Sequence, residues 1–194
     1  MKNFQFKSVK KVSYVVLLAA VSLTACGQQK EKAKETTAKT EVKAPDMALQ
    51  AAVVTGNLDV VKQHIAAGTD INEKDALSGA TPLITAITFD KNDIAQTLVD
   101  ADADLSIKNN DGSTALHVAA FFCRVEAVQL LMDAGADKTV KNNFGATPRE
   151  TVMGPFEDIK PIYEMMQQQL APIGLNLDMA EVEKTRPVVA MMLQ

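Results

Sequence analysis

The side chains that could do chemistry in this chain are few and widely separated. Its histidines are His64 and His117, and its cysteines are Cys26 and Cys123. Neither histidine has a second ligand at metal-site spacing, and no phosphate-binding glycine loop or nucleophile motif occurs. Cys123 stands beside Arg124, a cation that could activate a thiol. The pattern predicts no enzyme, no cofactor and no metal site, and it leaves open a redox-responsive role for Cys123.

A repeated motif organises the middle of the chain. Thr81, Thr114 and Thr147 open three copies that stand 33 positions apart. The first two copies read Thr-Pro-Leu-Ile-Thr-Ala and Thr-Ala-Leu-His-Val-Ala, and the third begins Thr-Pro. A 33-residue period with this head resembles the ankyrin repeats. The resemblance covers residues 47–152, with units at about 47–79, 80–112 and 113–145 and a degenerate fourth unit from 146.

The resemblance implies an all-α fold, an ankyrin-repeat α-solenoid of helix-turn-helix units joined by β-turn fingers. It also implies a structural hydrogen bond from His117 between neighbouring repeats. Thr81 is expected to cap the helix that starts at Pro82, because a threonine hydroxyl accepts a hydrogen bond from a backbone N–H of the first turn. Proline suits the first helical position. Glycines after the second helices should be left-handed, and Asp102 replaces one of them. At the inter-helix turns, Asp90 and Cys123 stand where another unit has glycine.

Partners of ankyrin repeats usually bind the concave face and the fingers, so residues there are candidate contacts. Phe89 and Phe122 are 33 positions apart and should be neighbours on one face. Two alternatives are open: both rings form an exposed binding hot spot, or both pack between the helices. Asparagine and aspartate in the fingers could equally serve to make turns. The full set of candidate partner-binding residues is Thr88, Phe89, Asn110, Asp111, Phe121, Phe122, Asn143 and Phe144.

The last 42 residues depart from the 33-residue period. Residues 156–170 have apolar residues at helical spacing, and Asp178 to Glu181 resembles a capping box that opens another helix. Pro187 is expected to break or restart that helix. Residues 153–194 therefore predict a helical C-terminal cap over the last repeat, with a separate partner-binding module as the alternative.

The N-terminus reads as a secretory signal peptide at residues 1–25. A basic region precedes an apolar run of 14 residues, from Val12 to Ala25. That run spans about 21 Å as a helix, which is short of the roughly 30 Å hydrocarbon core of a bilayer. It ends in Leu-Thr-Ala-Cys and resembles the lipobox of bacterial lipoproteins, which implies lipidation of Cys26. Residues 26–46 contain the lipidated cysteine and a flexible polar tether.

The net charge and the predicted lipid anchor limit the kind of partner and the location that we expect. The formal net charge is −4, and residues 1–25 contribute four lysines and no acid, so the remainder is more acidic still. An acidic domain argues against nucleic acid as a partner. We expect a monomeric module, lipid-anchored in the cell envelope, that binds another protein through its concave face. In a bacterium with two membranes, Gly27 favours the periplasmic face of the outer membrane. The alternatives are the redox-responsive protein and a structural or immunity-type envelope factor.

Overall fold

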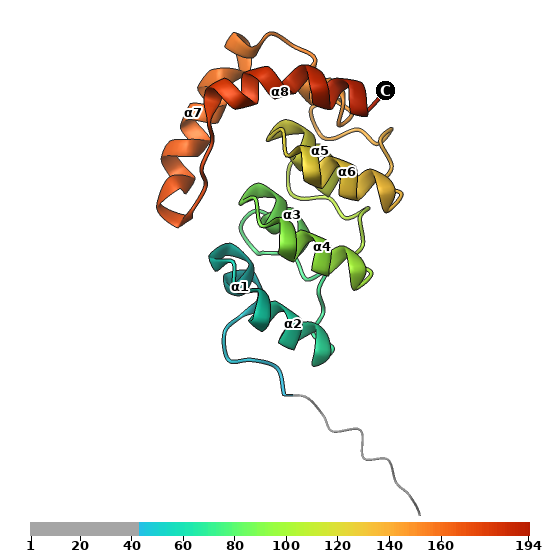
Figure 1. The fold of residues 1–194 in the computed structure, drawn as a ribbon, viewed down its shortest axis with the longest axis vertical. Helices are drawn as coiled ribbons and strands as arrows, with labels where there is room; N and C mark the ends of the chain where they lie inside the picture. Colours follow the sequence, from blue (N-terminus) through green and yellow to red (C-terminus); the bar gives the residue numbers. More distant parts are fainter. Residues whose placement is uncertain (1–42) are drawn as a thin grey trace, which may run out of the picture. The chain divides into compact units, whose positions relative to one another are not determined.

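The computed structural model describes residues 43–194, so the predicted signal peptide, Cys26 and most of the tether lie outside the described residues. Six short helices form three antiparallel pairs. They are α1 (Leu49–Thr55) with α2 (Leu58–Ala66), α3 (Pro82–Thr88) with α4 (Asn92–Asp100), and α5 (Ala115–Phe121) with α6 (Val125–Asp133). The first helices of the pairs stack in one row and the second helices in another (Figure 1). This region is a one-dimensional stack of similar units.

The repeated threonines begin the helices of the stack. The hydroxyl of Thr81 accepts a hydrogen bond from the backbone N–H of Ile84, and Pro82 is the first residue of α3, as predicted. Thr114 shares its cap with His117, whose Nδ1 lies 3.2 Å from the backbone nitrogen of Thr114. The motif therefore satisfies N–H groups that every helix N-terminus leaves without a partner inside the helix.

The left-handed positions follow the sequence prediction. Gly68 and Gly135 have φ values of 73° and 82°, and Asp102 occupies the equivalent place with φ 61°. At the inter-helix turns, Asp90 and Cys123 have φ values of 57° and 54°. These three side chains hold conformations that favour glycine, which costs some stability at each site.

Small residues allow the helices of the stack to approach closely. Ala86 and Ala119, each fully buried, occupy the same position in successive units. Large aliphatic side chains from neighbouring units close the core around them, and these include Val53, Leu83, Ile87, Ile94, Leu98, Leu116 and Leu131. Each unit completes its core only against its neighbours.

The fingers between the helix pairs are joined by a repeated set of hydrogen bonds. The Asn110 side chain donates to the backbone oxygen of Leu77 at 2.8 Å, and its own backbone N–H donates to Ser78. Asn143 repeats the pattern on the next finger, where it donates to the backbone oxygens of Asn110 and Asp111. The fingers therefore form a ladder along one edge of the stack.

The fourth unit keeps only the start of a repeat. The hydroxyl of Thr147 accepts from the backbone N–H of Glu150 at 3.3 Å, and the Glu150 carboxylate accepts from the Thr147 N–H at 2.7 Å. This capping box opens a single 3-10 turn, η1 (Glu150–Val152), in place of a first helix.

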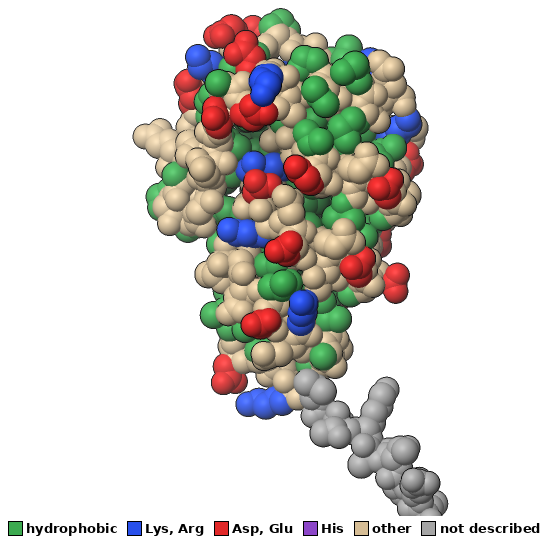
Figure 2. Space-filling model, in the orientation of Figure 1, with side chains coloured by type: hydrophobic (Ala, Val, Ile, Leu, Met, Phe, Trp, Pro, Cys, Tyr) green, Lys and Arg blue, Asp and Glu red, His purple; other side chains and the backbone are tan. Residues whose placement is uncertain are grey.

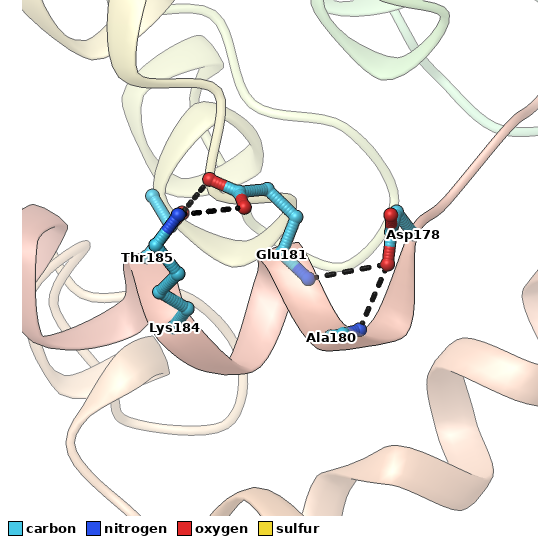
Figure 3. Close-up of polar contacts among 5 residues, drawn as sticks. All are labelled: Asp178, Ala180, Glu181, Lys184 and Thr185. Atoms are coloured by element: carbon cyan, nitrogen blue, oxygen red, sulfur yellow. Dashed lines mark hydrogen bonds and ion pairs between the residues drawn. The ribbon is translucent and has the colours of Figure 1, made fainter.

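The C-terminal region contains α7 (Phe156–Leu170), a 3-10 turn η2 (Ala171–Ile173) and α8 (Met179–Met192). The Asp178 carboxylate caps α8 by accepting from the N–H groups of Ala180 and Glu181, as predicted (Figure 3). The Glu181 side chain turns instead to Lys184 and Thr185, so the capping box is only half formed.

The expected break at Pro187 is wrong, because α8 continues through it to Met192. Proline removes one N–H donor from the helix, but packing holds the helix on both sides of it. Thr185, Arg186 and Val189 are buried around this point. Tertiary contacts therefore outweigh the local cost of the proline.

The two long C-terminal helices take different places on the stack. α8 packs across the end formed by α5, α6 and η1. α7 runs along the side of the first-helix row instead (Figure 1). One part of this region therefore closes the end of the solenoid, and the other part faces its inner surface.

Candidate binding groove

A groove of about 990 Å³ lies between the first-helix row, the fingers and α7. The floor comes from the first helices of all three pairs, with Val54, Ile84, Thr88 and Val118 among the residues that line it. The facing wall comes from α7 and η2, and its apolar residues are Ile159, Ile162, Met166, Leu170 and Ile173. The groove therefore has an apolar surface on two opposite sides. We refer to it below as the α7 groove.

Charge in the α7 groove is of one sign. Among the described residues that line it, Asp75 and Asp111 are the charged ones, and both come from the fingers. Hydrogen bonds from the Ser78 hydroxyl and the Leu77 backbone N–H lower the pKa of Asp75, so its carboxylate stays ionised at neutral pH. Burial lowers the pKa of His117, which leaves its ring neutral. The finger side of the groove is therefore acidic.

The wall is held in place by one buried side chain. Of the residues of α7, Tyr163 is buried, with no exposed surface. Its hydroxyl donates to the backbone oxygen of Phe121, at the end of α5, across 2.5 Å. The Tyr163 ring also lies 4.7 Å, centre to centre, from the Phe121 ring. Tyr163 therefore fixes α7 against the last repeat.

Arg186 completes this attachment from α8. Arg186 is 4% exposed, and its guanidinium donates to the Tyr163 hydroxyl at 3.2 Å and to the backbone oxygen of Gly154 at 2.9 Å. Within residues 43–194 it forms no ion pair with a carboxylate. Burial raises the pKa of Tyr163 to about 12, although the nearby Arg186 charge acts in the opposite direction. The hydroxyl thus remains a proton donor throughout the neutral range.

Six of the predicted partner-binding residues line the α7 groove. They are Thr88, Phe89, Asp111, Phe121, Phe122 and Phe144. For Phe89 and Phe122, the structure selects the packed alternative, since they are only 8% and 4% exposed. Both follow the last residue of a first helix, and their rings turn inward between the helices. The alternative of an exposed aromatic pair is therefore excluded, and among the six it is Phe144 that is largely exposed, at 79%.

The two asparagines of the predicted set have a structural role. Asn110 and Asn143 donate to the preceding finger and are not among the residues that line the groove. A Cβ atom added to Gly79 or Gly112 would lie within 2.4 Å of their side-chain oxygens. Glycine there lets each asparagine approach its neighbouring finger.

Sequence reasoning missed the residues of the second wall. The apolar spacing in 156–170 predicts one helical face, which includes Ile159, Ile162 and Met166, but a C-terminal cap would place that face on the last repeat. Their spacing was the available signal. What the spacing could not show is that α7 turns along the first-helix row, where Ile162 remains 44% exposed.

The remaining reactive side chains serve the fold. His117 contacts the backbone oxygen of Ala146 in the next unit at 3.1 Å, which is the inter-repeat role that the resemblance implied. His64 is 5% exposed and bonds to the Met47 backbone and Thr69. Burial raises the pKa of the Cys123 thiol to about 11 despite Arg186 and Arg124 nearby. A redox-responsive thiol needs the opposite shift.

The described charged side chains on the face drawn in Figure 2 form no second candidate site. In Figure 2, Lys and Arg side chains are scattered singly over the described part of one face. Within residues 43–194 no group of three or more His, Cys, Asp or Glu residues is arranged to hold a metal ion. No helix in this part of the chain is long and apolar enough to cross a bilayer.

Comparison with known proteins identifies the repeats. Residues 49–142 match the family model of ankyrin repeats in three copies. Protein phosphatase 1 regulatory subunit 27 from Homo sapiens and from Mus musculus is 42% identical over 65 residues, which are 34% of this chain and 42% of each relative. The chain thus spans about two fifths of these relatives.

The arrangement in space also has a solved counterpart. The crystal structure of the ankyrin repeat domain of Bcl-3, a member of the IkappaB protein family, aligns with a TM-score of 0.52 and 32% identity. The alignment covers 53% of this chain and 45% of that one. The middle of this chain therefore consists of ankyrin repeats, which are protein-binding modules, and its fold is an all-α ankyrin solenoid.

Proposed function

We propose that this protein is a non-catalytic, membrane-anchored module that holds another protein in its α7 groove. The observation that carries the proposal is the groove itself, an apolar surface along three repeats on the face where a solenoid presents its recognition surface. The similarity to protein phosphatase 1 regulatory subunit 27, which is named as a subunit of another protein, supports a protein as the partner. Contiguous exposed apolar surface with a polar rim is typical of ligand-binding and protein-binding grooves.

Binding rather than catalysis suits the residues that meet in the groove. The neutral imidazole of His117 is used in hydrogen bonds to Thr114 and Ala146. The Asp75 carboxylate accepts hydrogen bonds from its own finger. General acid-base chemistry needs a free titratable group aimed at a substrate, and these groups are engaged elsewhere.

Anchoring through Cys26 forms the second part of the proposal. Its support is the basic and apolar N-terminal pattern that ends in Leu-Thr-Ala-Cys. Lipid chains at Cys26 would hold the repeat domain at the membrane surface, on the periplasmic side in a cell with two membranes. Replacement of Cys26 by Ser tests this part: membrane fractionation and mass spectrometry of the mature N-terminus should show loss of the lipid and release of the protein. If the wild-type N-terminus carries no lipid mass, or if Cys26→Ser remains with the membrane as the wild type does, this part is refuted.

The binding proposal is tested by site-specific crosslinking in cells with a matched pair of variants. Thr88 and Thr97 belong to the same helix pair, and each hydroxyl donates to the carbonyl four residues earlier. Thr88 lines the groove, whereas Thr97 is not among its lining residues. Thr88→Arg should abolish crosslinks to a specific partner and Thr97→Arg should leave them unchanged. Equal crosslinking by both variants would show that the partner binds elsewhere.

A further inference from the structure

The α7 groove has two apolar walls with an open space between them, and its shape restricts what can fill it. We propose that it takes one helix of the partner, with a broad apolar face towards α7 and the first helices and with Lys or Arg residues towards the fingers. The proposal deepens the proposed function and rests on it. It assigns α7 as a binding element in addition to its place in the C-terminal region.

The size of the groove matches one face of a helix. α7 has 15 residues and is therefore about 22 Å long. A helix with side chains is about 10–12 Å across, so half of a cylinder of that length occupies roughly 860–1,240 Å³. The groove volume is about 990 Å³. One apolar helical face of three to four turns is therefore comparable in size to the groove.

Backbone polarity favours a helix over an extended segment. A helix satisfies its own N–H and C=O groups, whereas an isolated strand would bring unpaired groups against an apolar surface. Among the described residues, the groove floor comes from helices and contains no strand, so it offers no sheet edge for pairing. A helical partner segment avoids this desolvation cost.

Charge complementarity fixes the orientation of that helix. Asp75 and Asp111 are the charged lining residues, both lie on the finger side, and the neutral His117 adds no cation. Lys or Arg side chains on the partner can reach these carboxylates while their apolar stems cover the groove edge. An acidic flank would meet repulsion there instead.

The test uses synthetic peptides and the full chain. The probe is an 18-residue fluorescent peptide with leucine along one helical face and lysine on the other. Its controls are a peptide with glutamate in place of lysine and a scrambled leucine/lysine peptide. At physiological salt, fluorescence anisotropy should show saturable binding of the probe that is at least tenfold tighter than that of either control, which corresponds to about 1.4 kcal/mol. Circular dichroism should show the probe gaining helix on binding.

Two pairs of variants locate the site. Ile162 lines the groove and is 44% exposed, whereas Met165 on the same helix is 49% exposed and is not a lining residue. Ile162→Gln should weaken the probe at least tenfold and Met165→Gln should change it less than twofold. Asp111→Lys should weaken the probe, while Glu73→Lys, on a finger outside the groove, should leave it unchanged. Circular dichroism of each variant confirms that it is folded.

The outcomes separate this inference from the proposed function. No saturable binding of the probe, equal binding of all three peptides, or equal effects of Ile162→Gln and Met165→Gln would overturn it. If Thr88→Arg still abolishes partner crosslinks in cells, the groove binds a protein but not by the helical arrangement. If neither Thr88→Arg nor Ile162→Gln has an effect, both proposals fail.

Discussion

Tyr163→Phe is the most direct test of how α7 is attached. The substitution removes only the hydroxyl of a side chain with no exposed surface. It leaves the backbone oxygen of Phe121 and one nitrogen of Arg186 without their partner. A buried polar group without a partner costs about 1–3 kcal/mol, and a charged one costs more. We therefore expect a loss of roughly 2–4 kcal/mol in the free energy of unfolding, concentrated in α7.

The pH dependence gives a second magnitude for the same hydroxyl. The pKa of Tyr163 is about 12 in the folded protein against 10 as its ordinary value. Between these values the unfolded chain loses the proton while the folded chain keeps it, so stability falls as pH rises. The wild type should lose about 1.4 kcal/mol from this group by pH 11, a loss that Tyr163→Phe cannot show. The raised pKa of Cys123 also affects stability between pH 9 and 11, and a Cys123 thiolate raises the pKa of Tyr163, so both proteins are compared in a Cys123→Ser background.

Urea denaturation monitored by circular dichroism at pH 8 and pH 11 measures both quantities. Amide hydrogen exchange should show faster exchange in α7 of the variant than in α3 and α4. In the double variant Tyr163→Phe/Arg186→Met, the cost should be less than the sum of the two single costs, because the unpaired charge is gone. A loss below about 0.5 kcal/mol for Tyr163→Phe at pH 8 would refute this account of the attachment. So would free energies of unfolding that fall equally in wild type and variant between pH 8 and pH 11.

Three further predictions concern single positions in the repeats. Asp102→Gly should raise stability by about 0.5–1 kcal/mol, measured as a higher thermal midpoint, because φ at Asp102 is 61°. In urea denaturation, Gly112→Ala should lower the free energy of unfolding by at least 1 kcal/mol more than Gly135→Ala. Both glycines have positive φ, but only a Cβ at Gly112 would lie 2.3 Å from the Asn143 side-chain oxygen, so equal losses would contradict the finger ladder. Cys123, in a protein whose other cysteine is replaced by serine, should react with iodoacetamide at pH 7 about 100-fold more slowly than a free thiol, because burial raises its pKa to about 11.

The repeats could be predicted from the sequence because each motif residue acts locally. Thr81 caps its own helix, Asp102 keeps the left-handed backbone of the glycines it replaces, and His117 bonds to the adjoining unit. All three roles depend on neighbours at fixed sequence spacing. A 33-residue period supplies that spacing, so the fold followed from it.

The groove needed information that no local pattern contains. The 33-residue spacing placed Phe89 and Phe122 on one face, yet their rings could turn inward or outward, and burial between the helices turned them inward. The spacing in 156–170 predicted a helix without its direction. That direction depends on Tyr163 reaching Phe121, a contact 42 residues away in sequence, and on Arg186 from a third element.

The finger ladder and the fixed length of α7 together limit how this protein can evolve. Each joint between units uses the same asparagine-to-backbone contacts, so duplication of a 33-residue segment would add a unit with a ready-made joint. α7, however, has 15 residues and is attached to the last unit through Tyr163 at its midpoint. If the protein gained one unit, the floor of the α7 groove would therefore extend beyond the end of α7. Copy number and α7 length are expected to change together among its descendants.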